Sequence, residues 1–271
     1  MKTIKKLGIA GVFLGSLMTF QSANAAYSWT YSDNGTYCPN TGCVESSTVG
    51  SKTIQSTATG WYSNTSTGST IQQAYQLRVW DGLAVEATTG DNGVPQHATD
   101  NNTWYDSVLF DFGGDKVALD QIVMGWHKDS DFSLLRYTGN DTPVVAGQSY
   151  SDLNTTGGWE LVDNYFYAGN TQTGSDITFN VNPDNKSSSY WLVAALNPAY
   201  FNNSNYIGND YFKIKTLSGD YDDTCTVNCN PPCQGGNCGQ VPAPGSIALL
   251  LLGLPLLRIA RNKAKAEKLA A

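Results

Sequence analysis

The stretch Tyr-Trp-Leu-Val-Ala-Ala-Leu at residues 190–196 is apolar without interruption and indicates the fold class. Half-buried strands alternate apolar and polar side chains, whereas strands that are covered on both faces are apolar at nearly every position. This stretch therefore predicts the central strand of a sheet that is covered on both faces.

Segments on both sides of this stretch alternate apolar and polar residues with period two and end at Gly, Asn or Asp. We expect strands at residues 74–80, 83–88, 106–112, 117–126, 132–137, 159–167, 176–181 and 211–217. A phase change near Asp120 predicts a β-bulge. Short strands joined by such turns predict an all-β fold, an antiparallel β-sandwich of jelly-roll type. The Ser/Thr/Gly-rich residues 46–70 form either an irregular strand pair or a loose excursion.

The first 25 residues have the three parts of a signal peptide. Residues 2–6 carry three lysines, residues 7–20 are apolar, and Ser22-Ala23-Asn24-Ala25 offers the small residues that signal peptidase accepts. The alternative, an N-terminal membrane anchor, is disfavoured because a bilayer span needs roughly 20 apolar residues. We therefore expect cleavage after Ala25.

Residues 241–271 have the layout of a C-terminal sorting signal in three parts. Pro242, Pro244 and Gly245 lie in a turn-forming motif, residues 247–257 are apolar, and five basic residues follow. The apolar part is too short to cross roughly 30 Å of hydrocarbon as a straight helix, and the span is marginal even if Arg258 snorkels. We expect a short helical segment that tethers the chain transiently to the inner membrane; an ordinary C-terminal anchor is the alternative.

The chain between these two ends is strongly acidic. The whole chain carries −7; residues 1–25 contribute +3 and residues 241–271 contribute +4, which leaves −14 for residues 26–240. Such a surface repels phosphate backbones, so nucleic acid is not an expected partner. We divide this part into a β-sandwich domain, residues 26–220, and a Cys-, Pro- and Gly-rich stalk, residues 221–240.

Six cysteines in an exported chain predict disulfides. Cys38 and Cys43 bracket the turn-forming residues Pro39-Asn40-Thr41-Gly42, so we expect a disulfide that closes a small local loop. The other four lie in the stalk, where their connectivity stays open; they are Cys225, Cys229, Cys233 and Cys238. A zinc site is disfavoured there, because neither paired C-x₂-C spacing nor a nearby His is present.

Asp129-Ser130-Asp131 places two carboxylates one residue apart in an expected hairpin turn, and Asp100-Asn101 is a second polar pair that the fold can bring close. Carboxylate and amide oxygens are ligands for a hard cation. We expect no cofactor, because a full D-x-D-x-D-G loop is absent and an Asx-turn without an ion accounts for these residues. The alternative is a Ca²⁺ site with Asp129 and Asp131 as its candidate ligands.

Trp104 and Tyr105 stand in a polar stretch close to Asp100 and Asn101, so these two are the aromatic residues that we expect to be exposed. Aromatic rings stack on the apolar C–H faces of sugars, while Asp and Asn bond to sugar hydroxyls. The four residues therefore form a candidate binding site for an extracellular polysaccharide. The alternative is that the tryptophans of the chain fill the core of the sandwich.

The composition gives little support to catalysis. Residues 26–240 contain two histidines and three glutamates, and the sequence has neither a G-x-S-x-G elbow nor an H-E-x-x-H motif nor a Gly-rich phosphate loop. Ser and Asp are abundant, but no spacing marks a catalytic set. We therefore predict that the protein is not an enzyme and assign no catalytic residue.

The order of the C-terminal motif, apolar segment and basic end resembles the PEP-CTERM sorting signal of exosortase substrates, with Ala243 where that family usually has Glu. Residues 80–217 resemble small exosortase-dependent surface proteins. Two stretches carry this likeness: Pro95-Gln96-His97-Ala98-Thr99-Asp100-Asn101, and the run from Gly125 to Tyr137. The resemblance implies an address, the bacterial cell surface or extracellular matrix, and no chemistry.

Signal peptidase and an exosortase are the processing partners that this resemblance implies. We therefore expect a structural surface or matrix protein. The alternative is a carbohydrate-binding or adhesive module that contacts exopolysaccharide, with or without Ca²⁺.

Overall fold

The computed structural model describes residues 26–32, 35–64, 69–91, 97–167, 173–201 and 210–222. The expected signal peptide, residues 223–240 of the stalk with its four cysteines, and the sorting motif with Pro242, Pro244 and Gly245 lie outside these ranges. Within them the chain is almost entirely β-structure, with a single turn-and-a-half helix, α1 (Tyr150–Thr155), which begins at a Ser149 capping box. No helix in these ranges has the length and apolar character that crossing a bilayer requires.

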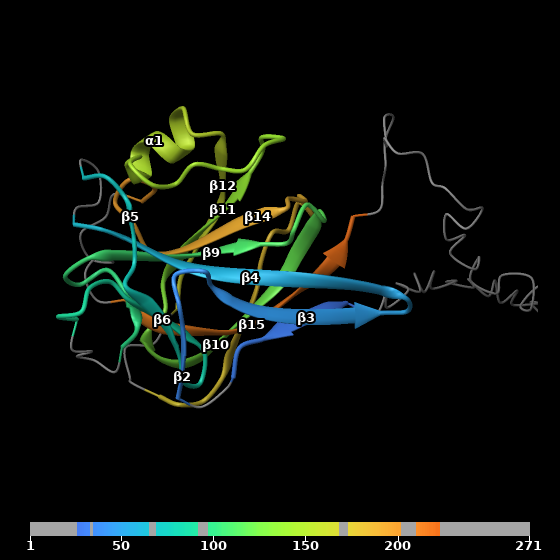
Figure 1. The fold of residues 1–271 in the computed structure, drawn as a ribbon, viewed down its shortest axis with the longest axis horizontal. Coiled ribbons are helices and arrows are strands. Elements are labelled where there is room, and N and C mark those ends of the chain that lie inside the picture. Colours follow the sequence, from blue (N-terminus) through green and yellow to red (C-terminus); the bar gives the residue numbers. More distant parts are fainter. Residues whose placement is uncertain are drawn as a thin grey trace, which may run out of the picture. The chain divides into compact units, whose positions relative to one another are not determined.

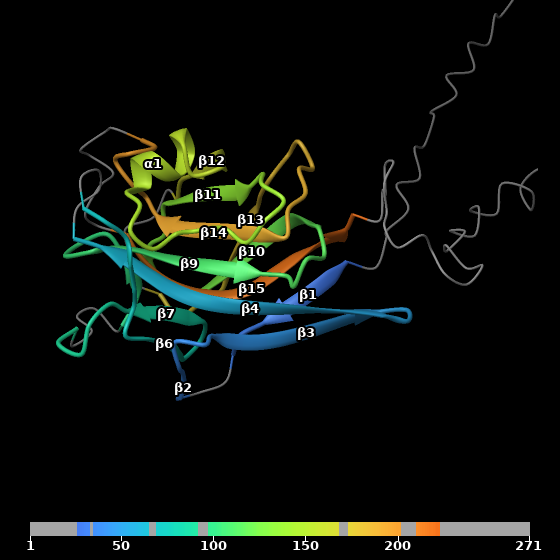
Figure 2. The same ribbon diagram turned by 45° about the horizontal axis from the view of Figure 1, so that its top comes forward.

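The strands form two antiparallel sheets that pack face to face (Figures 1 and 2). In the first sheet, β1 (Tyr27–Thr30) and β8 (Thr99–Asp100) pair with β15 beside the main strand order. That order is β13 (Ile177–Asn180), β10 (Val117–Asp129), β15 (Tyr211–Tyr221), β7 (Leu83–Glu86), β6 (Gln76–Val79) and β2 (Thr36–Cys38).

In the second sheet, β5 (Gln72–Gln73) pairs with β4 at the side. The main order is β12 (Trp159–Tyr165), β11 (Phe132–Tyr137), β14 (Tyr190–Ala195), β9 (Tyr105–Asp111), β4 (Lys52–Ser63) and β3 (Cys43–Val49). The chain crosses repeatedly between the two sheets. Examples are the connections from β9 to β10, from β10 to β11, from β13 to β14 and from β14 to β15. These crossings confirm the predicted antiparallel sandwich and are typical of the jelly-roll type.

The uninterrupted apolar stretch forms β14, which lies between β11 and β9 and is buried from Trp191 to Ala195. Its alternate residues serve two cores: Trp191 and Val193 pack between the sheets, while Leu192 and Ala194 pack under α1. Two buried tryptophans tie the sheets together, because Trp191 Nε1 donates to Val117 O at 3.0 Å and Trp29 Nε1 donates to Ile54 O at 2.9 Å. The central position predicted for this strand is confirmed.

Several local predictions can be compared directly with the strands. The register of β10 against β15 shifts between Leu119 and Gln121, which confirms the bulge at Asp120. Residues 46–70 include most of a regular β3–β4 hairpin, because Ile54, Ser56, Ala58 and Gly60 alternate inward even though three of the four are small or polar. The loose excursion is therefore excluded for residues 46–63. Cys38 and Cys43 form the expected disulfide, with Cα atoms 5.1 Å apart.

Candidate metal centre

Asp129 and Asp131 lie where the chain passes from one sheet to the other. Asp129 is the last residue of β10 in the first sheet, and β11 begins in the second sheet directly after Asp131. The expected hairpin turn at this point is therefore wrong, because β10 and β11 are not paired with each other. The crossing turns both carboxylates toward the end of the sandwich instead of toward solvent above a hairpin.

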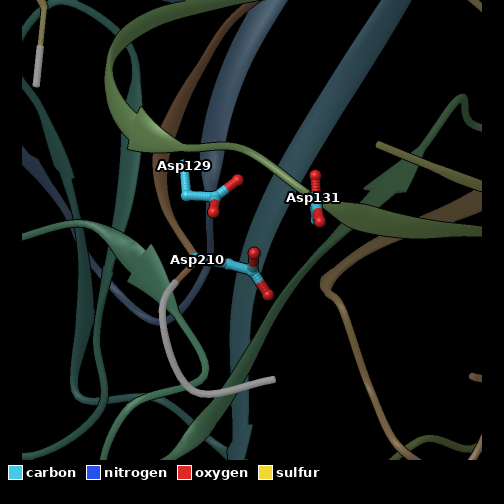
Figure 3. A group of neighbouring side chains, drawn as sticks. All are labelled: Asp129, Asp131 and Asp210. Atoms are coloured by element: carbon cyan, nitrogen blue, oxygen red, sulfur yellow. The ribbon is translucent and has the colours of Figure 1, made fainter. Parts of the chain in front are cut away.

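A third carboxylate joins them from the start of β15. Because β15 runs antiparallel to β10 and Asp129 pairs with Tyr211, the preceding residue, Asp210, is brought to the same end of the sandwich. Candidate ligand oxygens of Asp129, Asp131 and Asp210 all lie within 4.8 Å of one another, and the three carboxylates face a common space (Figure 3). We call these three residues the acidic cluster.

The acidic cluster is buried, which makes ionisation of its carboxyls energetically unfavourable. Asp129 is 7% exposed, Asp131 1% and Asp210 0%. Burial raises the pKa of Asp210 to about 9, with the nearby charges of Asp131 and Asp129 adding to the shift, and burial raises the pKa of Asp131 to about 7. The pKa of Asp129 is also raised, again mainly by burial. Three such carboxyls require protons or a cation to be stable at neutral pH.

Backbone and amide groups hold the acidic cluster in place. The Asn101 amide donates to Asp210 Oδ2 and to Leu196 O, the latter at 2.8 Å, and Asn101 Oδ1 accepts from Asp210 N at 3.1 Å. Tyr167 N donates to Asp131 Oδ1 at 2.5 Å. These contacts orient the carboxylates of Asp210 and Asp131. They engage Oδ2 of Asp210 and Oδ1 of Asp131.

Two buried oxygens at this place have no hydrogen-bond partner among the described residues. They are Asp210 Oδ1 and the hydroxyl oxygen of Ser130, and both residues are 0% exposed. A buried polar atom without a partner costs about 1–3 kcal/mol, so native structures rarely leave one unsatisfied. Asp210 Oδ1 is therefore a candidate ligand atom of the acidic cluster, since the Asp131 backbone N–H near the Asp210 carboxyl offsets only part of the rise in its pKa.

The sequence-predicted residues divide between two places. Asn101 does approach the acidic cluster, through Asp210, as expected. Asp100 does not: its backbone N–H donates to Asp106 Oδ2 at 3.2 Å, and these two carboxyls form a separate group that we call the acidic pair. Burial raises the pKa of Asp100 to about 7, and burial and the Asp100 charge raise that of Asp106 well above its ordinary value.

The expected exposed aromatic pair is only half exposed. Trp104 and Tyr105 are both of intermediate exposure; the Trp104 ring lies edge-on to Tyr62 at 6.3 Å, and the Tyr105 carbonyl accepts from the Tyr150 hydroxyl at 2.8 Å. The most exposed tryptophan of the described chain is Trp80, at 60%. Trp104 and Tyr105 are therefore less exposed than predicted, and whether they bind a ligand stays a prediction.

No protein-family model and no curated protein sequence matches the chain. The geometry of the site is therefore the guide to its chemistry.

The acidic cluster contains neither imidazole nor thiolate, which disfavours zinc and copper and favours a hard cation. Ca²⁺ takes six to eight oxygens at about 2.3–2.6 Å, so oxygens on opposite sides of one ion stand roughly 4.6–5.2 Å apart. Oxygens within 4.8 Å of one another fit around one such ion.

Proposed function

We propose that this chain is an exported surface or matrix protein whose β-sandwich is stabilised by Ca²⁺ at Asp129, Asp131 and Asp210. The observation that carries the proposal is Asp210 Oδ1, a fully buried carboxylate oxygen without a partner among the described residues, beside two further buried carboxylates. A divalent cation supplies the missing partner and removes the repulsion between the three charges.

The position of the acidic cluster gives the cation a structural role. The three carboxylates come from the end of β10, the start of β11 and the start of β15, so one ion links three strand ends and both sheets. A ligand that binds only the folded state at about 100 times its Kd stabilises that state by about 2.7 kcal/mol. For a domain of this size that corresponds to roughly 5–10 °C in Tm.

The extracellular address is supported by the sequence and by the disulfide. Residues 1–25 and 241–271 have the order of a signal peptide and of a sorting signal that resembles exosortase substrates. The Cys38–Cys43 disulfide fits an oxidising compartment, where Ca²⁺ is also abundant. In the producing cell, replacing Pro242, Pro244 and Gly245 by alanine tests the address: we expect the protein to remain in the membrane fraction, and unchanged surface display would contradict processing through this motif.

Thermal unfolding tests the cation site. We expect Ca²⁺ to raise the Tm of the wild-type protein by several degrees over EGTA, and to leave the Tm of Asp210→Asn unchanged. The matched control is Asp184→Asn, which removes one exposed carboxylate and should keep the full Ca²⁺ response. Equal responses of Asp210→Asn and Asp184→Asn would contradict the proposed site.

The second candidate function is a carbohydrate-binding or adhesive module. One observation favours it: an exposed tryptophan on the first sheet, Trp80, is held next to an unpaired lysine. The ligand class that this arrangement fits is argued below.

A further inference from the structure

The outward face of the first sheet carries two indole rings around one ammonium group. Trp80 follows β6, Trp126 lies in β10, and Lys213 lies in β15. The Lys213 Nζ atom is 5.9 Å from the centre of the Trp80 ring and 5.5 Å from that of Trp126. We call these three residues the Trp80–Lys213 patch.

Lys213 differs from Arg78 and Lys215 on this face in forming no ion pair among the described residues. Arg78 pairs with Glu86 at 3.0 Å, and Lys215 pairs with Asp81 at 2.9 Å and with Asp176 at 2.8 Å. Lys213 forms no side-chain hydrogen bond with the described residues either, although it is only 4% exposed. Burial lowers the pKa of Lys213, and the nearby Asp81 carboxylate, which pairs with Lys215, offsets only part of this shift. The Lys213 ammonium is therefore a candidate partner for an anion.

The backbone fixes Trp80 rigidly over the sheet. Trp80 belongs to a tight turn in which its N–H donates to Gly82 O at 3.1 Å, with positive φ at Asp81 (58°) and Gly82 (120°). The turn lies directly on β10, because a Cβ at Gly125 would be 2.0 Å from Asp81 O. A Cβ at Gly82 would likewise be 2.9 Å from the Lys213 backbone. Two glycines thus let the turn lie against the sheet, which fixes the backbone position from which the 60% exposed Trp80 side chain projects.

We propose that the Trp80–Lys213 patch binds a carboxylate-bearing polysaccharide, with a uronate pyranose stacked on the Trp80 ring and its carboxylate paired with Lys213. The flat indole face fits the C–H face of a sugar ring, and the unpaired ammonium fits one carboxylate beside it. Residues 26–240 carry −14 and repel any polyanion, a uronate polymer included, so binding depends on the local contacts of Trp80 and Lys213. This inference names the ligand of a surface or matrix protein and does not depend on Ca²⁺.

A cleft elsewhere on the molecule fits such a ligand less well. It has a volume of about 450 Å³ and is lined by Arg136, Tyr137, Tyr190 and Lys116 among others. Arg136 is already satisfied, because it bonds to Glu160 at 2.5 Å and to Ser187 O at 3.0 Å. Lys116 is exposed and therefore solvated, whereas the Lys213 ammonium is buried beside two indole rings.

Titration calorimetry of the Ca²⁺-loaded full chain with short oligogalacturonates, which are too small to gel with Ca²⁺, tests the proposal. Neutral dextran oligomers, a single-stranded oligonucleotide and anionic lipid vesicles serve as competing probes. We expect oligogalacturonate alone to bind, and Trp80→Ala and Lys213→Gln each to weaken binding at least about tenfold. Lys213→Arg should retain binding, and equal melting temperatures should show that each variant is folded.

The matched controls are Trp104→Ala, at the half-buried tryptophan, and Lys116→Gln, at an exposed lysine of the same charge; both should bind like the wild type. Equal binding of dextran, an unaffected Lys213→Gln, or loss of binding only in Trp104→Ala would overturn the proposal, as would preferred binding of nucleic acid or vesicles. Asp210→Asn separates the two proposals. Uronate binding that persists in that variant while its Ca²⁺ response is lost supports both proposals and shows that they are independent. Uronate binding together with a full Ca²⁺ response in that variant retains the patch and rejects the cation site, and a wild-type Ca²⁺ response without uronate binding retains the cation site and rejects the patch.

Discussion

The acidic cluster and the acidic pair are built from the same chemistry and stand on opposite sides of one short strand. Asp100 and Asn101 are neighbours at β8, yet Asp100 belongs to the pair with Asp106 and Asn101 supports Asp210 in the cluster. In both groups burial raises carboxyl pKa values. The two groups differ in the number and direction of their oxygens, since three carboxylates converge in the acidic cluster and two in the acidic pair.

This difference teaches how a buried carboxylate group is neutralised. Two carboxyls can be neutralised by a single shared proton, because only one of them then stays charged and their mutual repulsion is removed. Three carboxyls with oxygens directed at one space create a site that a divalent cation fills better than protons do. We therefore infer that the cluster is a cation site and that the pair is a proton site.

The largest expected effect is on the stoichiometry and affinity of Ca²⁺ binding. If the acidic cluster alone binds the cation, calorimetry at pH 7.5 gives one Ca²⁺ per chain. Asp131→Asn should then lower the affinity for Ca²⁺ by about 100-fold or more. Loss of a residue that only supports a ligand costs roughly 10- to 100-fold, and loss of a direct ligand should cost more. Asp106→Asn in the pair should leave the affinity within about twofold. Two ions per chain, one of them lost in Asp106→Asn, would show that the acidic pair also binds a cation and would contradict its assignment as a proton site.

A smaller effect is expected at Asn101, which supports the cluster without being a proposed ligand. Asn101→Ala removes the donors to Asp210 and Leu196, so Asp210 is no longer oriented. We expect Ca²⁺ affinity to fall about 10- to 100-fold and the unfolding free energy of the metal-free protein to fall by about 1–3 kcal/mol. Asn102→Ala, at the exposed neighbouring residue, is the control. If both variants behave alike, the amide of Asn101 has no specific role.

The sequence was sufficient for most of the fold because its strands are patterned locally. β11 begins and ends where the alternation predicts, and the phase change at Asp120 locates the bulge in β10. The β3–β4 hairpin was harder to predict because its inward positions include Ser56 and Gly60. A Cβ at Gly60 would be 2.9 Å from Leu77 Cδ2, so a larger residue there would push the Leu77 side chain aside. Small inward residues carry a weak hydrophobic signal even in a regular strand.

The candidate site was only partly predictable because it is completed by a long-range pairing. Asp129 and Asp131 stand together in the sequence, but Asp210 reaches them only because β15 pairs with β10. Nothing local distinguishes Asp210 from the other aspartates that precede strands. The Trp80–Lys213 patch was not predicted for the same reason. That Lys213 forms no ion pair among the described residues can be recognised only when the neighbours of β15 are known.

The smallest effect separates proton from cation control and concerns the acidic pair. Its raised carboxyl pKa values mean that the folded state binds protons more tightly than the unfolded state, so stability is greatest near pH 4 and declines as pH rises toward 7, the approximate pKa of Asp100. Each proton contributes at most about 1.4 kcal/mol per pH unit. In Ca²⁺-saturated protein, Asp106→Asn keeps an acceptor for the Asp100 N–H and removes one charge. We expect its unfolding free energy to decline less between pH 5 and pH 7.5 than that of the wild type, as measured by urea denaturation. Taking this difference cancels other groups with a raised pKa, such as Asp120. A parallel decline in both proteins would show that the pair stays ionised and is not a proton site.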